Sequence, residues 1–397
     1  MPAPVYFLVH EDELSVQPEV TYGVKPGVAA AADFFKHTST RVGITRKLDR
    51  YYRDQDRDFQ QASVKSAHTG RQSTGISIDG DLIPNGSAVT PTAPDTNNFW
   101  KALFGSGTTL TGHTTTGAGT VGTALVLAAG GGVASGIRVG GGDLIAVDVD
   151  ATNGVEVRRV VSRTVDAVVL DRALTADPAA GQNVYVGTTY NLSTTTLISL
   201  YLWLWNGAIK YQYPGLSLSD GSITVDFSQK TPVAKQKFAG EASVEVPNAD
   251  ARPTPTTHGI PLVPSKGKVW FGTTKLAAMI NMMISIKSGL ELRNVEASQL
   301  SPTGVKRTGN NARWLVEQSI ETFFTDSMQT FYDGARTIGA IDTIVQLGTS
   351  VGNIVAWSCP KWQPDAANSE NGGELGLKFS GRALGTAGDD EVSLAFI

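Results

Sequence analysis

The chain has 397 residues, of which 41% are hydrophobic and 18% are charged, and its formal net charge is −4. This length exceeds one ordinary domain, and the charge argues against a nucleic-acid protein held by bulk positive charge. The 43 glycines, with abundant threonine and serine, favour strands and turns over helices. The single cysteine, Cys359, excludes an internal disulfide and a thiolate metal cluster, so we interpret it as a small buried hydrophobe.

The N-terminus predicts no export signal, because residues 1–4 lack a basic segment followed by an apolar run. The most apolar runs, residues 124–133 and 276–286, are too short to span a bilayer. We therefore expect a protein that is made and folded in a reducing cytoplasm.

Residues 46–58 follow a β-like stretch and are rich in charges of both signs. They predict either a solvated hairpin tip or an arm that docks on a neighbouring subunit. Arginine and tyrosine are enriched at interfaces, and mixed charges suit a complementary protein patch better than a phosphate backbone. The candidate interface residues are Arg46, Arg50, Tyr51, Tyr52, Arg53 and Arg57.

Residues 71–105 predict a strand, a proline-containing loop and a short helix. Ile76, Ile78 and Leu82 fall on alternate positions with polar residues between them, which is typical of a strand with one wet face. Asp95 is the predicted N-cap of the helix, and Gly105 suits the left-handed residue that ends it. One face of this helix is apolar: Phe99, Trp100, Leu103 and Phe104.

Residues 107–188 differ from the preceding residues in composition and in the spacing of their β runs, which indicates an inserted domain. A threonine- and glycine-rich linker opens the segment. Five short β runs follow, separated by turn signals: residues 124–127, 143–149, 155–161, 167–170 and 183–186. We predict a small five-stranded β-barrel on the outer surface, since surface loops accept insertions whose ends lie close together.

The first module then resumes, so that it comprises residues 1–106 and 189–246. Its remaining strands are expected at residues 194–205, 208–213, 222–227 and 238–246. The proline-rich residues 247–264 are predicted to be a connector, because they suit neither a central strand nor a helix.

Residues 265–397 predict a second module with the same order of elements. Residues 314–324 alternate like the first strand, and a short helix follows, capped by Thr325 or Asp326 and ended by Gly334. Met328, Phe331 and Tyr332 line its apolar face. Further strands are expected at 269–272, 282–295, 343–349, 353–359, 375–382 and 392–397. The predicted fold class is therefore mainly β with short helices, built on a duplicated strand–helix–strand module.

No arrangement of residues predicts catalysis or a cofactor. The five histidines are scattered without metal-ligand spacing. Residues 117–122 fit Gly-x-Gly-x-x-Gly, but a linker precedes them and a strand-like run follows, whereas dinucleotide binding needs a strand and then a helix. We expect a structural or interaction protein with no enzymatic activity, cofactor or metal.

The chain resembles the tail tube proteins of long-tailed (siphovirus-like) bacteriophages. The resemblance lies in residues 70–87, which read as strand and proline-containing loop, and in residues 98–105, a short aromatic helix ending in Phe-Gly. It implies a tail-tube-like β-barrel or sandwich module whose copies assemble into rings. Stacked rings would form a hollow virion tube that contains a tape-measure protein and later passes DNA without specific binding.

The resemblance also implies terminator and distal tail proteins as partners at the tube ends. If modules of this family form six-fold rings, two modules in one chain predict a trimeric ring with pseudo-six-fold symmetry. The alternative is an unrelated second half and six chains per ring. We also expect that removal of the inserted barrel would leave tube assembly intact.

Two other functions stay open at this stage. One is a distal-tail or baseplate hub protein of the same fold group. The other is a carbohydrate-binding β protein or glycan hydrolase, in which exposed Trp203, Trp205 and Trp270 would form a sugar platform. The latter ranks lower, because it needs paired carboxylates in a cleft and an export signal.

The charged arm yields the first prediction. Replacing Arg50, Arg53 and Arg57 by alanine should impair tube assembly and leave the monomer folded, because the substitutions remove interface cations and no core side chain. Tube length and yield in electron micrographs, beside the circular dichroism of the monomer, measure the two effects. Normal tubes from this variant would show that the arm is only a solvated tip.

Overall fold

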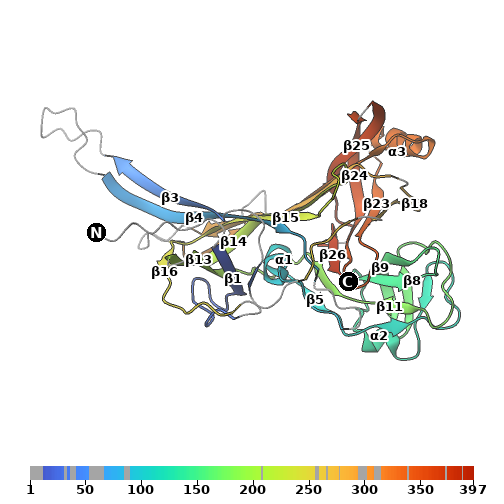
Figure 1. Ribbon diagram of the computed structural model, residues 1–397, viewed down its shortest axis with the longest axis horizontal. Helices are drawn as coiled ribbons and strands as arrows, with labels where there is room; N and C mark the ends of the chain where they lie inside the picture. The colour runs from blue at the N-terminus through green and yellow to red at the C-terminus, as the bar shows by residue number, and fades with distance from the viewer. Residues whose placement is uncertain are drawn as a thin grey trace, which may run out of the picture.

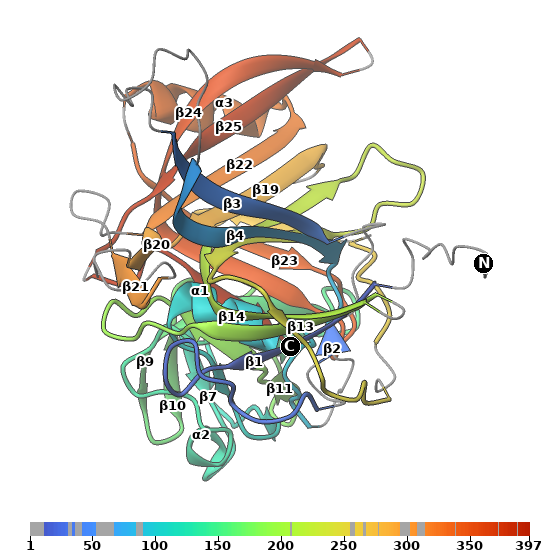
Figure 2. The same cartoon turned by 90° about the vertical axis from the view of Figure 1, so that its left-hand side faces the viewer.

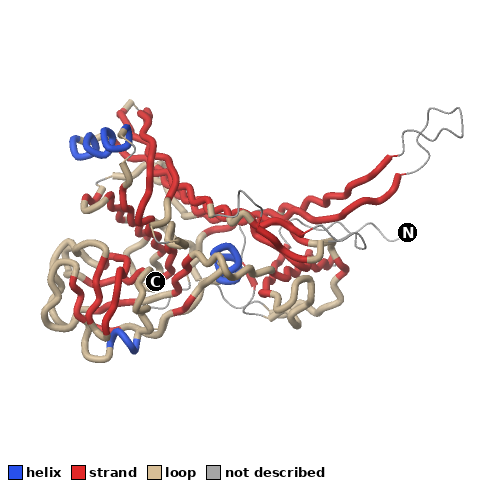
Figure 3. Tube along the Cα trace, turned by 180° about the vertical axis from the view of Figure 1, so that it is seen from behind, coloured by secondary structure: helices blue, strands red, loops and turns tan. Residues whose placement is uncertain are grey.

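The computed structural model of the chain is mainly β, with three helices in the part that it describes (Figures 1 and 3). The described residues are 12–30, 34–35, 42–52, 67–84, 90–206, 209–254, 259–264, 267–276, 278–293, 302–307, 314–337, 339–371, 373–386 and 388–397. The helices are α1 (Asn97–Phe104), α2 (Gly131–Ala134) and α3 (Asp326–Arg336).

A curled antiparallel sheet runs through the whole molecule. Its central strands, in spatial order, are β3 (Gly43–Tyr52), β4 (Ala67–Asp81), β15 (Lys235–Ala242), β14 (Ile209–Asp226), β19 (Asn281–Lys287), β22 (Leu315–Phe323), β25 (Glu374–Ala383) and β24 (Val355–Asn371). In Figure 1 the strands β3 and β4 rise on one side and β24 and β25 on the other, so the sheet is concave on the side away from α1.

The two halves of the chain pair their strands in the same order. In the first half, β1 (Asp12–Pro18) pairs with β13 (Leu200–Asn206), and the order continues through β14, β15, β4 and β3. In the second half, β17 (Lys268–Phe271) pairs with β23 (Ile341–Leu347), and the order continues through β24, β25, β22 and β19. The halves join where β14 pairs with β19.

One glycine occupies the same place in each half. A Cβ atom at Gly240 of β15 would lie 2.3 Å from the carbonyl oxygen of Ser217 on β14. A Cβ atom at Gly381 of β25 would lie 2.0 Å from the carbonyl oxygen of Gln363 on β24. At these two positions β15 passes so close to β14, and β25 so close to β24, that only glycine fits.

Aromatic side chains hold a helix against the outer face of the sheet in each half. Phe99 of α1 stacks on Phe238 of β15, with ring centres 4.9 Å apart. In the second half, Phe331 of α3 contacts Phe271, and Phe271 contacts Phe379 of β25, both at 5.4 Å. Figure 3 shows both helices on the face opposite the concave one, which they shield from water.

Short strands complete the sheet. They are β2 (Phe34–Phe35), β5 (Thr108–Thr109), β12 (Thr188–Asn191), β16 (Val246–Pro247), β18 (Thr274–Lys275) and β26 (Ser393–Phe396), while β20 (Leu290–Arg293) and β21 (Gly304–Arg307) form a separate hairpin. The predicted connector has no regular structure in its described residues 248–254 and 259–264, yet Leu262 is fully buried in the main core.

Several element boundaries differ from the prediction. Thr96 rather than Asp95 is the N-cap of α1, and α3 continues past Gly334 to Arg336. The predicted strands 208–213 and 222–227 are one strand, β14, and the predicted strand 353–359 extends to residue 371 as β24. Both long strands continue through a proline because the register shifts there, at Pro214 and at Pro360, and a bulge does not need the missing amide.

The inserted domain is a barrel of six strands rather than five. They run in the order β6 (Thr114–Thr115), β11 (Asn183–Tyr185), β8 (Leu144–Asp148), β9 (Val155–Thr164), β10 (Ala167–Leu170) and β7 (Ala124–Val126). A bridge between Thr116 and Leu127 joins the first strand to the last and closes the barrel. The extra strand, β6, lies in the threonine-rich stretch that composition alone indicates as linker.

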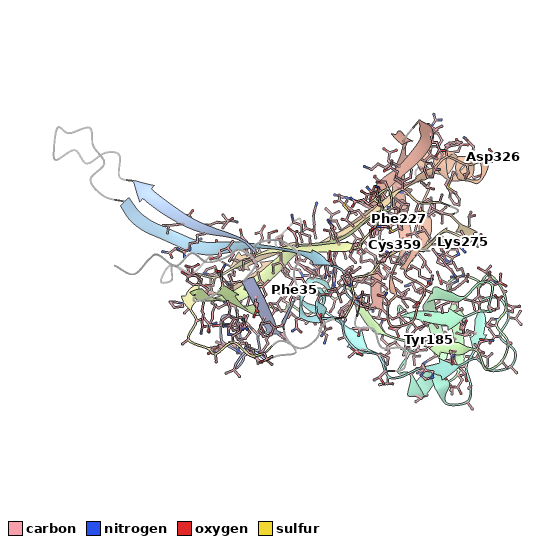
Figure 4. All side chains as sticks on the ribbon, viewed as in Figure 1. Phe35, Tyr185, Phe227, Lys275, Asp326 and Cys359 are labelled. Carbon is pink, nitrogen blue, oxygen red and sulfur yellow. The ribbon has the colours of Figure 1, made fainter. Side chains whose placement is uncertain are left out.

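The barrel is packed against the second half of the chain, in addition to its covalent links. Leu144, Ala146 and Val157 of the barrel form one buried cluster with Ile354 and Ile397. The partly buried Tyr185, labelled in Figure 4, packs at its border. Removing the barrel would therefore expose apolar surface of the second half, while its effect on tube assembly stays a prediction.

A buried ion pair stands at the same junction. The Arg158 guanidinium donates to Glu156 at 2.6 Å and lies 4.5 Å from the ring centre of Trp270, which belongs to β17. Burial disfavours the charged form of Glu156, but Arg158 and hydrogen bonds from Thr175 outweigh it and hold the pKa of the carboxyl below its usual range. Lys268 of β17 donates to the carbonyl oxygens of Asn153 and Val155 at 2.6 and 2.9 Å. Polar and apolar contacts thus fix the barrel in one orientation.

The paired glycines yield a stability prediction. Gly240→Ala and Gly381→Ala should each lower the free energy of unfolding by about 1–3 kcal/mol, because the new methyl group meets a backbone oxygen that cannot move aside freely. The matched control is Gly334→Ala in α3, where nothing lies within 4 Å of the new atom. There alanine should be neutral or stabilise by up to about 1 kcal/mol. Denaturant unfolding measures all three, and equal effects would refute the proposed packing.

The buried ion pair yields a second prediction. Arg158→Ala should lower the free energy of unfolding by about 3–5 kcal/mol, because the buried Glu156 carboxylate loses its hydrogen-bonded cation and keeps only Lys268, at 3.7 Å. The control is Lys237→Ala, which removes a pair with Asp79 in which the side chains are 58% and 51% exposed. That change should cost less than about 1 kcal/mol. A small loss for Arg158→Ala would mean that the barrel does not depend on this contact.

Candidate functional site

The concave face of the sheet is mostly polar, with apolar side chains such as the 37% exposed Met283 among the polar ones. Alternate residues of the central strands point to it, while the residues between them are buried in the main core beneath the helices and the neighbouring strands. Its charged positions carry both signs: Asp79, Asp81, Asp220, Asp226, Glu241, Glu317, Glu321 and Asp365, with Lys47, Lys235, Lys237, Lys287, Lys378 and Arg382. Figure 2 looks onto this face from the side of β3 and β4.

Ion pairs between neighbouring strands balance much of this charge. Lys287 of β19 lies 3.2 Å from Glu317 of β22, and Lys237 of β15 lies 3.7 Å from Asp79 of β4. Lys47 of β3 reaches across the strand β4 at Gly75 and pairs with Glu241 of β15. The surface is therefore hydrated and charged without a field of one sign, so it offers a polyanion little to bind.

The strands β3 and β4 form a hairpin that projects from the body of the molecule (Figure 1). Arg50, Tyr51 and Tyr52 occupy the last described positions of β3, paired with Thr69, His68 and Ala67. Arg53 and Arg57 lie outside the described residues. The structure thus brings the described arm residues together on one hairpin.

Arg46 lies at the base of this hairpin and is engaged within the chain. Its guanidinium forms an ion pair with Glu245, and this hydrogen bond raises the pKa of Arg46. The Glu245 side chain is 15% exposed, whereas that of Arg46 is 65% exposed. Arg46 therefore fixes the base of the hairpin to the segment before β16, and its free face still points to solvent.

The tryptophans of the proposed sugar platform are in the interior. Trp203, Trp205 and Trp270 are 0%, 2% and 2% exposed. The indole N–H of Trp203 donates to Asp250 at 3.0 Å. They cannot stack on a glycan unless their surroundings unfold. The expectation of exposed tryptophans, on which the carbohydrate-binding function depended, is therefore wrong.

The remaining candidates for chemistry have structural roles. Cys359 lies inside the second half (Figure 4), and burial raises the pKa of its thiol to about 12. Residues 117–122 lead into the strand β7 of the barrel rather than into a helix. Among the described residues, no group of three or more His, Cys, Asp and Glu side chains is placed to hold a metal ion. Nor does any described helix combine the length and apolar character needed to cross a membrane.

Sequence reasoning did not single out the residues that make the concave face. Lys47 appears there only as one charge in a mixed run, and Asp365 of β24 lies beyond the end of the predicted strand. The available signal was the alternation of polar residues in β4 and β22. It places Asp79 and Glu321 on one wet face but does not show that the two wet faces adjoin.

Comparison with known protein families and with curated proteins found no match.

Proposed function

We propose that this chain is a structural virion protein that self-assembles into stacked rings and forms the tube of a long phage tail. The observation that carries the proposal is one curved sheet in which two halves repeat the same strand order and join edge to edge. A unit that joins its copy at a sheet edge, with a constant curvature, generates a closed ring when the rotation of the repeated step adds up to a full turn.

The two halves would then be copies of one tail-tube-like module. Each has a strand, a short helix and returning strands in the same order, and each has the close glycine crossing of Gly240 or Gly381. Three chains would supply six modules, the number that the resemblance implies for a ring. The described helices would lie on the outside of such a ring, and the concave face would line its lumen.

The charge pattern of the concave face suits a conduit. DNA would pass along this hydrated wall without being held, because Lys47, Lys237 and Lys287 are paired with carboxylates and the other cations lie among acidic side chains. By the same proposal the chain has no enzymatic role or cofactor. Its partners are its own copies, a tape-measure protein in the lumen, and terminator and distal tail proteins at the ends.

Assembly of the purified protein tests this function. Negative-stain images at rising protein concentration should show hollow tubes of uniform width, since ring stacking needs no other component in this account. Discrete rings that never stack would favour a distal-tail or baseplate hub protein. A protein that stays monomeric at all concentrations, with native circular dichroism, would contradict the proposal.

A further inference from the structure

The contact between the two halves is a complete strand pairing whose register is known. Residues 220–226 of β14 pair antiparallel with residues 281–287 of β19, with Asp220 opposite Lys287 and Ile223 opposite Ile284. Ile223 and Ile284 are 0% and 1% exposed. This contact shows which edges of the module fit each other and in which register.

Two edges of the central sheet remain without a strand partner in the described part of the chain. One is the outer edge of β3, which pairs only with β4. The other is the outer edge of β24 at residues 365–371, which pairs with β25 on its other side. They correspond, in the repeated strand order, to β19 and to the second half of β14, the two strands that join the halves.

The strand registers identify which residue of β24 is equivalent to Asp220 of β14. Ala239, next to Gly240, lies opposite Asp220 of β14. Ser380, next to Gly381, lies opposite Asp365 of β24. Asp365 therefore occupies the place of Asp220.

The registers also identify which residue of β3 is equivalent to Lys287 of β19. Ala239 also faces Ser77 of β4, and Ser380 also faces Ser319 of β22. Four residues before each serine, Ser73 faces Lys47 of β3, and Leu315 faces Lys287 of β19. Lys47 therefore occupies the place of Lys287.

We propose that β24 of one chain pairs antiparallel with β3 of a second copy, with Asp365 opposite Lys47, Ala367 opposite Thr45 and Ser369 opposite Gly43. The inference rests on the proposed ring and names the contact that closes it. It repeats between chains the register that β14 and β19 adopt within one chain. An aspartate again lies opposite a lysine at the start of the pairing, and each lysine also forms an ion pair with a glutamate of its own chain, Lys287 with Glu317 and Lys47 with Glu241.

Two local features agree with this pairing. Ile44 of β3 is only partly buried, whereas Ile284, which occupies the equivalent place and has a neighbouring strand, is 1% exposed. A second copy would cover Ile44 in the same way. Pro364 immediately precedes the paired stretch of β24, so its missing amide N–H costs no hydrogen bond of the new ladder.

A cysteine pair tests the register. The double variant Thr45→Cys, Ala367→Cys is assembled, oxidised and run on a non-reducing gel, where we expect a covalent three-chain species from each closed ring. Ser222→Cys with Ser285→Cys is the positive control, because these residues face each other inside one chain and should form an internal disulfide. Thr45→Cys with Ala366→Cys is the negative control, since adjacent residues of a strand point to opposite faces.

The outcomes separate this inference from the proposed function. Tubes that form without cross-linked chains, while the positive control is oxidised, overturn the register and leave the tube intact. A six-chain species confirms the register and overturns the three-chain ring, and failure of the unmodified chain to form rings overturns both. If the cysteine variant does not assemble, Asp365→Lys replaces it: ring yield should fall at least tenfold, because the new lysine would lie opposite Lys47, and an unchanged yield overturns the pairing.

Discussion

The pairing of β14 with β19 is the interaction on which the rest of the structure depends. It turns two separate groups of strands into one continuous sheet and fixes the angle between the halves. Backbone hydrogen bonds supply the register, and buried side chains such as Ile223 and Ile284 exclude a slip, because a shift by one residue would turn them to the wet face. The curvature, the polar concave surface and the two open edges all follow from this contact.

The layers outside the sheet explain how it stays curved. Helices α1 and α3 cover the convex face through aromatic contacts at equivalent places, and the close glycine crossings let the long strands bend over their partners. The inserted barrel covers a further surface of the second half and is fixed there by Arg158, Glu156 and Lys268. The barrel therefore supports the second half, and no counterpart of it is inserted between α3 and β23.

Alternating apolar residues were enough to predict the strands β4 and β22. Cap residues and an apolar face predicted the helices that follow them, and a threonine- and glycine-rich linker with regular turn signals predicted the position of the insert. The same reasoning failed where a strand passes through a proline, because Pro214 and Pro360 predict breaks and only the partner strand shows that they are bulges. The sixth barrel strand was missed because threonine-rich linkers and short edge strands have the same composition. Ion pairs such as the one between Lys47 and Glu241 join strands that are far apart in the sequence, so no local sequence pattern could predict them.

The mass of a single ring tests the central claim most directly, namely that the two halves of the chain occupy equivalent places in one closed sheet. Native mass spectrometry of rings released from the tube gives this number without an assumption about symmetry. Equivalent halves require three 41.9 kDa chains per ring. A ring of six chains would show that only one half of each chain lines the lumen, and the halves would then not be equivalent.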